Sequence, residues 1–162
     1  MLLYRLSKHA CVRDLYGEGA RRVGGRWNEK GIPVLYTYNT LSLAFLEILC
    51  HMKPEMVKNL FSVLVFEYNE TKFPLQGLTE SSLPSNWNDF STPLSTIEMG
   101  SLWAKSRSSI GLKIPSAAFP FMNESEWNVL INPLHRDFDR AVKVKDVFPF
   151  SYDDRLNQLM EN

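Results

Sequence analysis

The sequence has few cysteines, no excess of charge of either sign and no long apolar run. Cys11 and Cys50 are the only thiols among 162 residues, which excludes a disulfide framework and a CxxC metal motif. Basic and acidic side chains balance at 18 each, which disfavours a general nucleic-acid-binding protein and favours association with a partner. No run approaches the roughly 18 apolar residues of a membrane span, and the first ten residues lack a signal-peptide pattern. We therefore expect a cytoplasmic protein that contacts neither DNA nor a membrane directly.

Histidine is also scarce, and the glycines do not form a nucleotide-binding fingerprint. His9, His51 and His135 are far apart in the sequence, so no metal site is expected. The glycine-rich stretch at 16–25 lacks the GxGxxG spacing, and a predicted strand rather than a helix follows it. A Rossmann dinucleotide site is therefore disfavoured.

The periodicity of apolar residues predicts a single domain, residues 1–162, of the α+β class. Strand-like runs outnumber helical patterns and do not alternate regularly with them. The predicted strands lie at 2–7, 32–38, 60–68, 110–120, 127–133 and 141–150, and the predicted helices at 39–52 and 93–107.

The apolar patterns also predict which parts of these elements are buried. The strand at 60–68 is apolar on both faces and should be central, whereas the strand at 141–150 should have one wet face. The glycine-rich residues 17–31 are expected to form a loop. In the helix at 93–107 the core candidates are Leu94, Ile97, Leu102 and Trp103.

The predicted helix at 39–52 is apolar on nearly every side and yet carries Glu47. At 100° per residue, Glu47 shares one narrow sector with Thr40, Ala44 and His51. A helix this apolar should be packed on most sides. The sector is either a thin strip facing solvent or one wall of a cleft, where a carboxylate can stabilise developing positive charge.

The same glycine-rich stretch holds a local cluster of basic side chains. Arg21, Arg22 and Arg26 lie within six residues of one another. Arginine suits bidentate recognition of phosphate or carboxylate groups. The alternative is a charged loop that is simply solvated.

Four segments, in order and covering essentially the whole chain, resemble the signature motifs of the RES domain family. GGRWNEKGIPVLYTYNTLSLAFLEILCH resembles the first motif, with Gly-Arg-Trp, a strand ending in Tyr and a helix containing Glu. MGSLWAKSRSSIGLKIPSAAFP resembles the second, NVLINPLHRDF the third and FSYDDRL the usual ending. Arg136 stands where many members have proline, which affects the expected shape of one loop.

This resemblance implies the site residues. The residues that give the family its name, with an accompanying aromatic, would be catalytic: Arg26, Glu47, Ser116 and Tyr36. Weaker candidates for lining the pocket or contacting the cofactor are Arg5, Trp27, Asn132 and His135. A structural ion pair is an equal alternative for Arg5.

The resemblance also implies a fold and an activity. The fold would be like that of ADP-ribosyltransferases, with a split, mostly antiparallel β core and flanking helices around an NAD cleft. The protein would be the toxin of a bacterial type II toxin–antitoxin system, an enzyme that arrests growth by cleaving the nicotinamide–ribose bond of NAD+. The acceptor would be inorganic phosphate or water. The partner would be an Xre-type helix–turn–helix antitoxin whose C-terminal part blocks the cleft, and a toxin homodimer is expected within that complex.

The expected chemistry explains the unusual carboxylate. As nicotinamide leaves, the ribose gains oxocarbenium-like charge, which Glu47 would stabilise in surroundings of lowered dielectric. Arg26 would bind a phosphate or orient the ribose, Tyr36 would offer a flat ring, and Ser116 would be a polar anchor. Two other functions remain open: a mono-ADP-ribosyltransferase that modifies a host-cell protein, and a catalytically inactive module that binds a partner.

Overall fold

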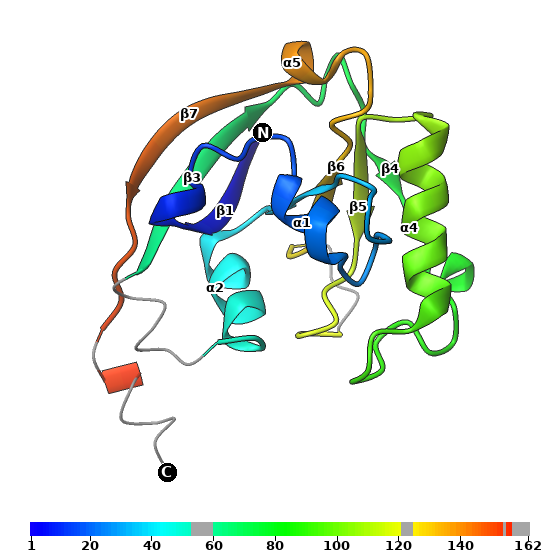
Figure 1. Ribbon diagram of the computed structural model, residues 1–162, viewed down its shortest axis with the longest axis horizontal. Helices are drawn as coiled ribbons and strands as arrows, with labels where there is room; N and C mark the ends of the chain where they lie inside the picture. The colour runs from blue at the N-terminus through cyan, green and yellow to red at the C-terminus, as the bar shows by residue number, and fades with distance from the viewer. Residues whose placement is uncertain (53–59, 121–124, 154, 157–162) are drawn as a thin grey trace.

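The structure of the protein is a computed structural model, which describes residues 1–52, 60–120, 125–153 and 155–156. Its strands form one sheet in the order β4-β5-β6-β2-β1-β3-β7 (Figure 1). The strands are β1 (Leu2–Lys8), β2 (Leu35–Tyr38), β3 (Phe61–Tyr68), β4 (Gln76–Gly77), β5 (Gly111–Ile114), β6 (Asn128–Ile131) and β7 (Val142–Pro149). The α-helices are α1 (Glu18–Val23), α2 (Leu41–Leu49), α4 (Leu94–Ser106) and α5 (Phe138–Ala141), with 3₁₀ turns at His9–Cys11 and Glu80–Ser82.

The sheet is split at its centre. β1 meets β2 through a single residue pair, Tyr4 with Tyr38, whereas β1 pairs with β3 along its whole length. Of the described strand pairs, only β4 with β5 is parallel. The prediction of an α+β fold with a split, mostly antiparallel core is therefore confirmed.

Side chains that alternate along each strand divide the core into separate apolar clusters. In β6, Val129 and Ile131 pack with β1, β3 and α5, while Leu130 faces the opposite way, towards Trp27 and Trp103. The residues of α2 belong to a third cluster, which covers β1 and β3. The helix α2 thus packs on one half of the split sheet, and α4 packs on the other.

The helix predicted at 93–107 forms as α4, but a different face of it is buried. Trp103 is buried, as predicted. Leu94 and Leu102 are each 66% exposed, so the prediction that these two leucines lie in the core was wrong. The buried face carries small residues, and a Cβ atom at Gly100 would lie 2.0 Å from the carbonyl oxygen of Trp27. The helix therefore approaches the backbone at Trp27 directly, which only glycine permits.

The expected loop at 17–31 contains a short helix, α1. Both carboxylate oxygens of Asp14 accept hydrogen bonds from its first turn, from the backbone N–H groups of Glu18 and Gly19, each at 2.9 Å. Gly17, with φ at +69°, precedes the helix, and a Cβ atom there would lie 2.5 Å from the carbonyl oxygen of Val34. The loop prediction was wrong because a capping carboxylate upstream starts the helix despite its glycines.

The two longest strands, β3 and β7, differ in burial. β3 lies between β1 and β7 and is buried along almost all of its length, as predicted. β7 is an edge strand in which even Val144 and Val147 are 41% and 45% exposed, so both of its faces are wet rather than one. Among the described residues, no helix has both the length and the apolar character needed to cross a bilayer.

Candidate active site

The carboxylate of Glu47 lies where α2 meets the other half of the sheet. The helix begins after Thr40, whose hydroxyl accepts a hydrogen bond from the N–H of Leu43 at 3.2 Å. Oε1 of Glu47 accepts two hydrogen bonds, from Ser116 Oγ at 2.7 Å and from Asn128 Nδ2 at 2.6 Å. These short contacts join three segments that are far apart in the sequence.

The exposed side of α2 is not the side that carries Glu47. Ser42, Leu46 and Cys50, spaced four residues apart, are exposed, while Ala44 is buried and Glu47 is half-buried. In Figure 1 the segment that follows β5 (yellow) passes between α2 (cyan) and the loop that leads into α4 (green). The carboxylate therefore faces other segments of the protein rather than bulk solvent.

Ser116 is a buried bridge between the helix and the turn after β5. Its side chain is 3% exposed, and its hydroxyl donates to Glu47 while accepting from the N–H of Phe119 at 3.1 Å. Because the hydroxyl proton is already directed at a carboxylate, the geometry suits an anchor for Glu47 better than a free nucleophile.

Tyr36 pairs with Leu130 of β6, on the same face of the sheet as Asn128, and is held there by the Gly-Arg-Trp segment. Its hydroxyl donates to Asn28 Oδ1 at 2.8 Å and accepts from the N–H of Trp27 at 3.0 Å. A Cβ atom at residue 25 would lie 2.6 Å from that hydroxyl, so Gly25 provides the space. Burial raises the pKa of Tyr36, and the nearby charge of Glu47 raises it further, so the phenol stays protonated.

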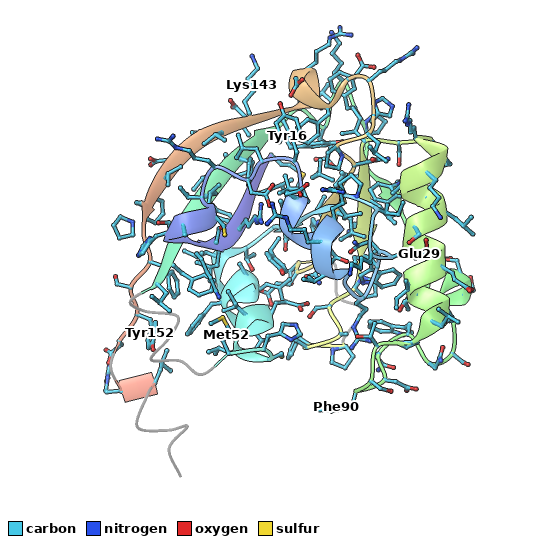
Figure 2. The ribbon with its side chains drawn as sticks, viewed as in Figure 1. Tyr16, Glu29, Met52, Phe90, Lys143 and Tyr152 are labelled. Carbon is cyan, nitrogen blue, oxygen red and sulfur yellow. The ribbon has the colours of Figure 1, made fainter. Side chains whose placement is uncertain are left out.

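Arg26 clamps the loop that precedes α4. Its half-buried guanidinium donates from Nη1 to the carbonyl oxygen of Trp87 and from Nη2 to that of Asp89, both at 3.0 Å. Phe90 in this loop is fully exposed and points away from the fold (Figure 2). The positive charge of Arg26 acts to lower the pKa of Tyr36, against the effect of Glu47, so the charges of both Arg26 and Glu47 act on the Tyr36 hydroxyl.

A comparison with known protein families identifies the family of the chain. The profile described as "RES domain" matches residues 2–153. The chain belongs to the RES domain family. Its relatives include proteins named "Toxin Res" from Photorhabdus laumondii, 36% identical over 96% of this chain and 97% of that protein, and from Yersinia enterocolitica, 33% identical over 96% and 99%. Another relative, a "Prs ADP-ribosylating toxin" from a Sphingobium species, is 33% identical over 88% and 86%.

A solved structure shares the fold of this RES domain. A chain in the crystal structure of the MbcT–MbcA toxin–antitoxin complex from M. tuberculosis superposes with a TM-score of 0.72. The match covers 98% of the present chain and 87% of the other, at 16% sequence identity. At that identity the likeness concerns the arrangement of helices and strands.

Arg5 of the RES domain lies at the split in the sheet and is engaged with Asp14. Its Nη1 donates to the carbonyl oxygen of Asp14 at 2.6 Å, and its Nη2 lies 3.8 Å from the carboxylate. Burial lowers the pKa of Arg5, an effect that the charge of Asp14 opposes. Tyr38 is close to both Arg5 and Glu47: burial raises the pKa of Tyr38, Glu47 adds to the rise, and Arg5 counteracts it.

The structure does not bring the indole of Trp27 or the side chain of Asn132 to Glu47. Trp27 is 2% exposed and packs with Trp103 in the cluster under α4, and its contact with Tyr36 uses the backbone. Asn132 is fully buried and donates from Nδ2 to the carbonyl oxygen of Ala104 at 2.9 Å. Both residues support the fold around the site from a distance, and their predicted contribution to NAD binding stays a prediction.

His135 also lies beyond the far end of β6. Asn132 follows Asn128 by four residue steps, which corresponds to roughly 13 Å at about 3.3 Å per residue. Nδ1 of His135 accepts from the N–H of Asp137 at 3.1 Å, and the ring lines a surface pocket of about 400 Å³ with Phe73. That pocket belongs to the opposite end of the sheet from Glu47.

Two asparagines that the sequence analysis did not select contact the predicted site residues directly. Asn128 binds Glu47, and Asn28 binds Tyr36 and is itself only 1% exposed. The available signal was a polar residue at the start of the otherwise apolar stretch NVLI, where a buried amide requires a partner.

Proposed function

We propose that this RES domain is the toxin of a type II toxin–antitoxin system and that it consumes NAD+ by cleaving the nicotinamide–ribose bond. The observation that carries the proposal is the half-buried carboxylate of Glu47, with Oε1 held by both Ser116 and Asn128. The names of the relatives support it, since two are called Res toxins and a third is an ADP-ribosylating toxin.

The carboxylate provides what this bond cleavage requires. Positive charge develops on the ribose as the C–N bond lengthens, and a fixed negative charge stabilises that transition state. No hydrogen bond reaches Oε2 of Glu47 from the described residues, so this oxygen is available to the sugar. Because the nicotinamide ring is cationic in NAD+, it departs as a neutral molecule with the bonding electrons, and no general acid is needed.

Arg26 and Tyr36 would bind the dinucleotide next to Glu47. A guanidinium has five N–H groups, of which Arg26 uses two on the carbonyl oxygens of Trp87 and Asp89. The remaining donors suit a phosphate of NAD+. The ring of Tyr36, kept neutral by burial, offers a flat surface for nicotinamide or its ribose.

The acceptor of the ADP-ribosyl group is inorganic phosphate or water in the first form of the proposal. A mono-ADP-ribosyltransferase that modifies a protein is the second candidate, favoured by the Sphingobium relative. Within the described part of the chain, no group of histidine, cysteine, aspartate or glutamate side chains is arranged to hold a metal ion. NAD+ is thus proposed as the substrate, bound by the residues of the chain itself.

The proposed partner is an antitoxin of the Xre type that covers the cleft. The shared fold with a chain of a toxin–antitoxin complex supports this assignment. Co-expression with a candidate antitoxin of the Xre type should restore growth and yield a stable complex on gel filtration, whose mass also reports whether the toxin is a dimer. Continued growth arrest in the presence of that antitoxin would count against the pairing.

Incubation of the purified protein with NAD+ tests the activity. We expect free nicotinamide together with ADP-ribose, or with ADP-ribose 1″-phosphate when inorganic phosphate is added, while label on a protein would indicate the transferase. Glu47→Gln should slow the reaction by about 10²- to 10³-fold. The matched control is Glu29→Gln, because Glu29 lies beside α4, paired with Lys105 at 3.0 Å (Figure 2), and should retain activity. A Glu47→Gln variant that consumed NAD+ at the rate of the wild type would refute the assignment.

A further inference from the structure

We propose that Asn128 is a positioning residue that holds the carboxylate of Glu47 in its reactive orientation. This inference rests on the proposed function and extends it to Asn128, which begins the third motif segment but was not among the predicted site residues. Asn128 touches the carboxylate rather than the substrate, so its contribution to the reaction is exerted through Glu47.

The sheet aims Asn128 at α2. It is the first residue of β6 and pairs with Tyr38 on one side and with Ile114 on the other. Side chains on directly paired residues share a face of the sheet. Asn128 is 6% exposed on this face, with Nδ2 2.6 Å from Oε1 of Glu47.

The two donors to Glu47 come from β6 and the turn after β5, whereas the carboxylate is carried by α2, whose apolar side chains pack mainly on β1 and β3. Asn128 begins β6, and Ser116 follows β5, its antiparallel partner, so both donors belong to one hydrogen-bonded unit. The helix α2 follows β2 in the sequence, but its apolar side chains pack mainly on β1 and β3, which meet β2 through a single residue pair. The hydrogen bonds to Oε1 therefore fix the carboxylate relative to the half of the sheet that carries Tyr36.

The oxygen of the Asn128 amide indicates that the residue does more than support the fold. Oδ1 of Asn128 is buried and has no hydrogen-bond partner among the described residues. A buried polar atom without a partner is costly, and an apolar residue of similar shape would avoid that cost. Rotating the amide by 180° would bring Oδ1 against Oε1 of Glu47, so the carboxylate selects the observed orientation. The amide thus donates to the carboxylate of Glu47 in an orientation that leaves its own oxygen without a hydrogen bond from the described residues.

Three variants of the full chain test the inference. Asn128→Leu should keep the melting temperature near that of the wild type while kcat falls about 10- to 100-fold and KM changes little, since the donor acts on the transition state. Asn128→Asp should also lose activity at neutral pH and regain part of it in acid, because two carboxylates in contact share a proton. Thr37→Val removes another buried hydrogen bond, from Thr37 to the carbonyl oxygen of Val129, and should lower the melting temperature with kcat unchanged.

The outcomes separate a positioning role from a structural one. Wild-type kcat in Asn128→Leu, or equal losses of kcat in Asn128→Leu and Thr37→Val, would overturn the inference. An unchanged pH profile in Asn128→Asp would overturn it as well.

A measurement without NAD+ distinguishes failure of this inference from failure of the proposed function. The side-chain amide proton of Asn128 should resonate downfield in a ¹⁵N–¹H spectrum, because it donates to a charged group, and should return to the ordinary region in Glu47→Ala. If the wild type does not consume NAD+ but shows this signal, the proposed function fails while the contact between Asn128 and Glu47 stands. An amide signal at the ordinary position would remove the basis for a positioning role.

Discussion

Asn128 and Asn132 mark the two ends of one strand, and both amides are buried, but they are satisfied in different ways. Asn132 donates to the carbonyl oxygen of Ala104 and accepts from the N–H of Leu134, so both ends of its amide are paired with backbone. Asn128 donates to a carboxylate and leaves its oxygen without a partner in the described part of the chain. An amide that only supports a fold is expected to resemble Asn132, because a buried unpaired atom reduces stability.

This contrast distinguishes the two ends of the sheet. At the end near Asn132, polar side chains connect backbone segments. Near Asn128, and on the same face of the sheet at Tyr36, polar side chains hold ionisable side chains instead: Ser116 contacts Glu47, and Asn28 contacts the Tyr36 hydroxyl. Side chains that position other side chains are typical of binding and catalytic sites, which need a fixed first layer of groups.

The largest expected effect comes from neutralising the carboxylate at the Asn128 end. Glu47→Gln should lower kcat by about 10²- to 10³-fold, because a fixed charge that stabilises the transition state is lost. Its free energy of unfolding should change by less than about 1 kcal/mol, since an amide oxygen can still accept from both donors. Initial rates of nicotinamide release and urea denaturation give the two quantities. A large loss of stability with little loss of rate would show that Glu47, like Asn132, supports the fold rather than the reaction.

Asn132→Ala should have the opposite profile in stability. The substitution leaves the carbonyl oxygen of Ala104 and the N–H of Leu134 without their partners, so the free energy of unfolding should fall by about 2–4 kcal/mol. Urea denaturation measures the loss. A change below about 0.5 kcal/mol would show that the two hydrogen bonds do not stabilise this end of the sheet.

The elements predicted well from the sequence are those specified by local patterns. The run of apolar residues after Thr40 specified α2, and the apolar strand at 60–68 specified β3. The buried face of α4 was predicted wrongly because the helix packs through Gly100 against the backbone of Trp27, an approach that hydrophobicity does not encode. Small residues at a close contact look like weak helix formers until the neighbouring segment is known.

Part of the candidate site could also be predicted from local sequence patterns. The family motifs indicated Glu47, Ser116 and Tyr36; in the fold Ser116 contacts Glu47, and Tyr36 lies close enough for the charge of Glu47 to raise its pKa. Asn128 escaped notice because its partner lies 81 residues away in the sequence, and a single asparagine at a strand end has many ordinary explanations. The second role of Arg26, as a clamp on the loop before α4, depends on backbone carbonyl groups that carry no sequence signal.

Arg26→Lys tests whether that clamp matters for binding. A lysine ammonium carries one compact charge and cannot reproduce the planar fork that spans the carbonyl oxygens of Trp87 and Asp89. We expect KM for NAD+ to rise about 10-fold with a smaller change in kcat, because a positioned phosphate donor is lost. Arg22→Lys is the control, since Arg22 is exposed and pairs with Glu18 at 3.0 Å. An unchanged KM in Arg26→Lys would assign Arg26 to the fold alone.

The smallest effect concerns Asp14, a carboxylate satisfied by backbone in the manner of Asn132. Burial favours the protonated acid, but the N–H groups of Gly19 and Glu18 and the charge of Arg5 outweigh it, so the pKa of Asp14 lies below its ordinary value of 3.8. A carboxyl group with a depressed pKa adds stability that is fully present above the ordinary pKa and is lost as the pH falls through the folded-state value. Asp14→Asn should therefore be less stable than the wild type at pH 7 by a margin that stays constant to about pH 4 and shrinks below it. Thermal melts of both proteins from pH 7 to pH 2 measure this margin, and a margin that widened in acid would contradict the depressed pKa. Because Asp14 holds α1 and Arg5 rather than Glu47, the same substitution should alter the melting temperature more than the rate of NAD+ consumption.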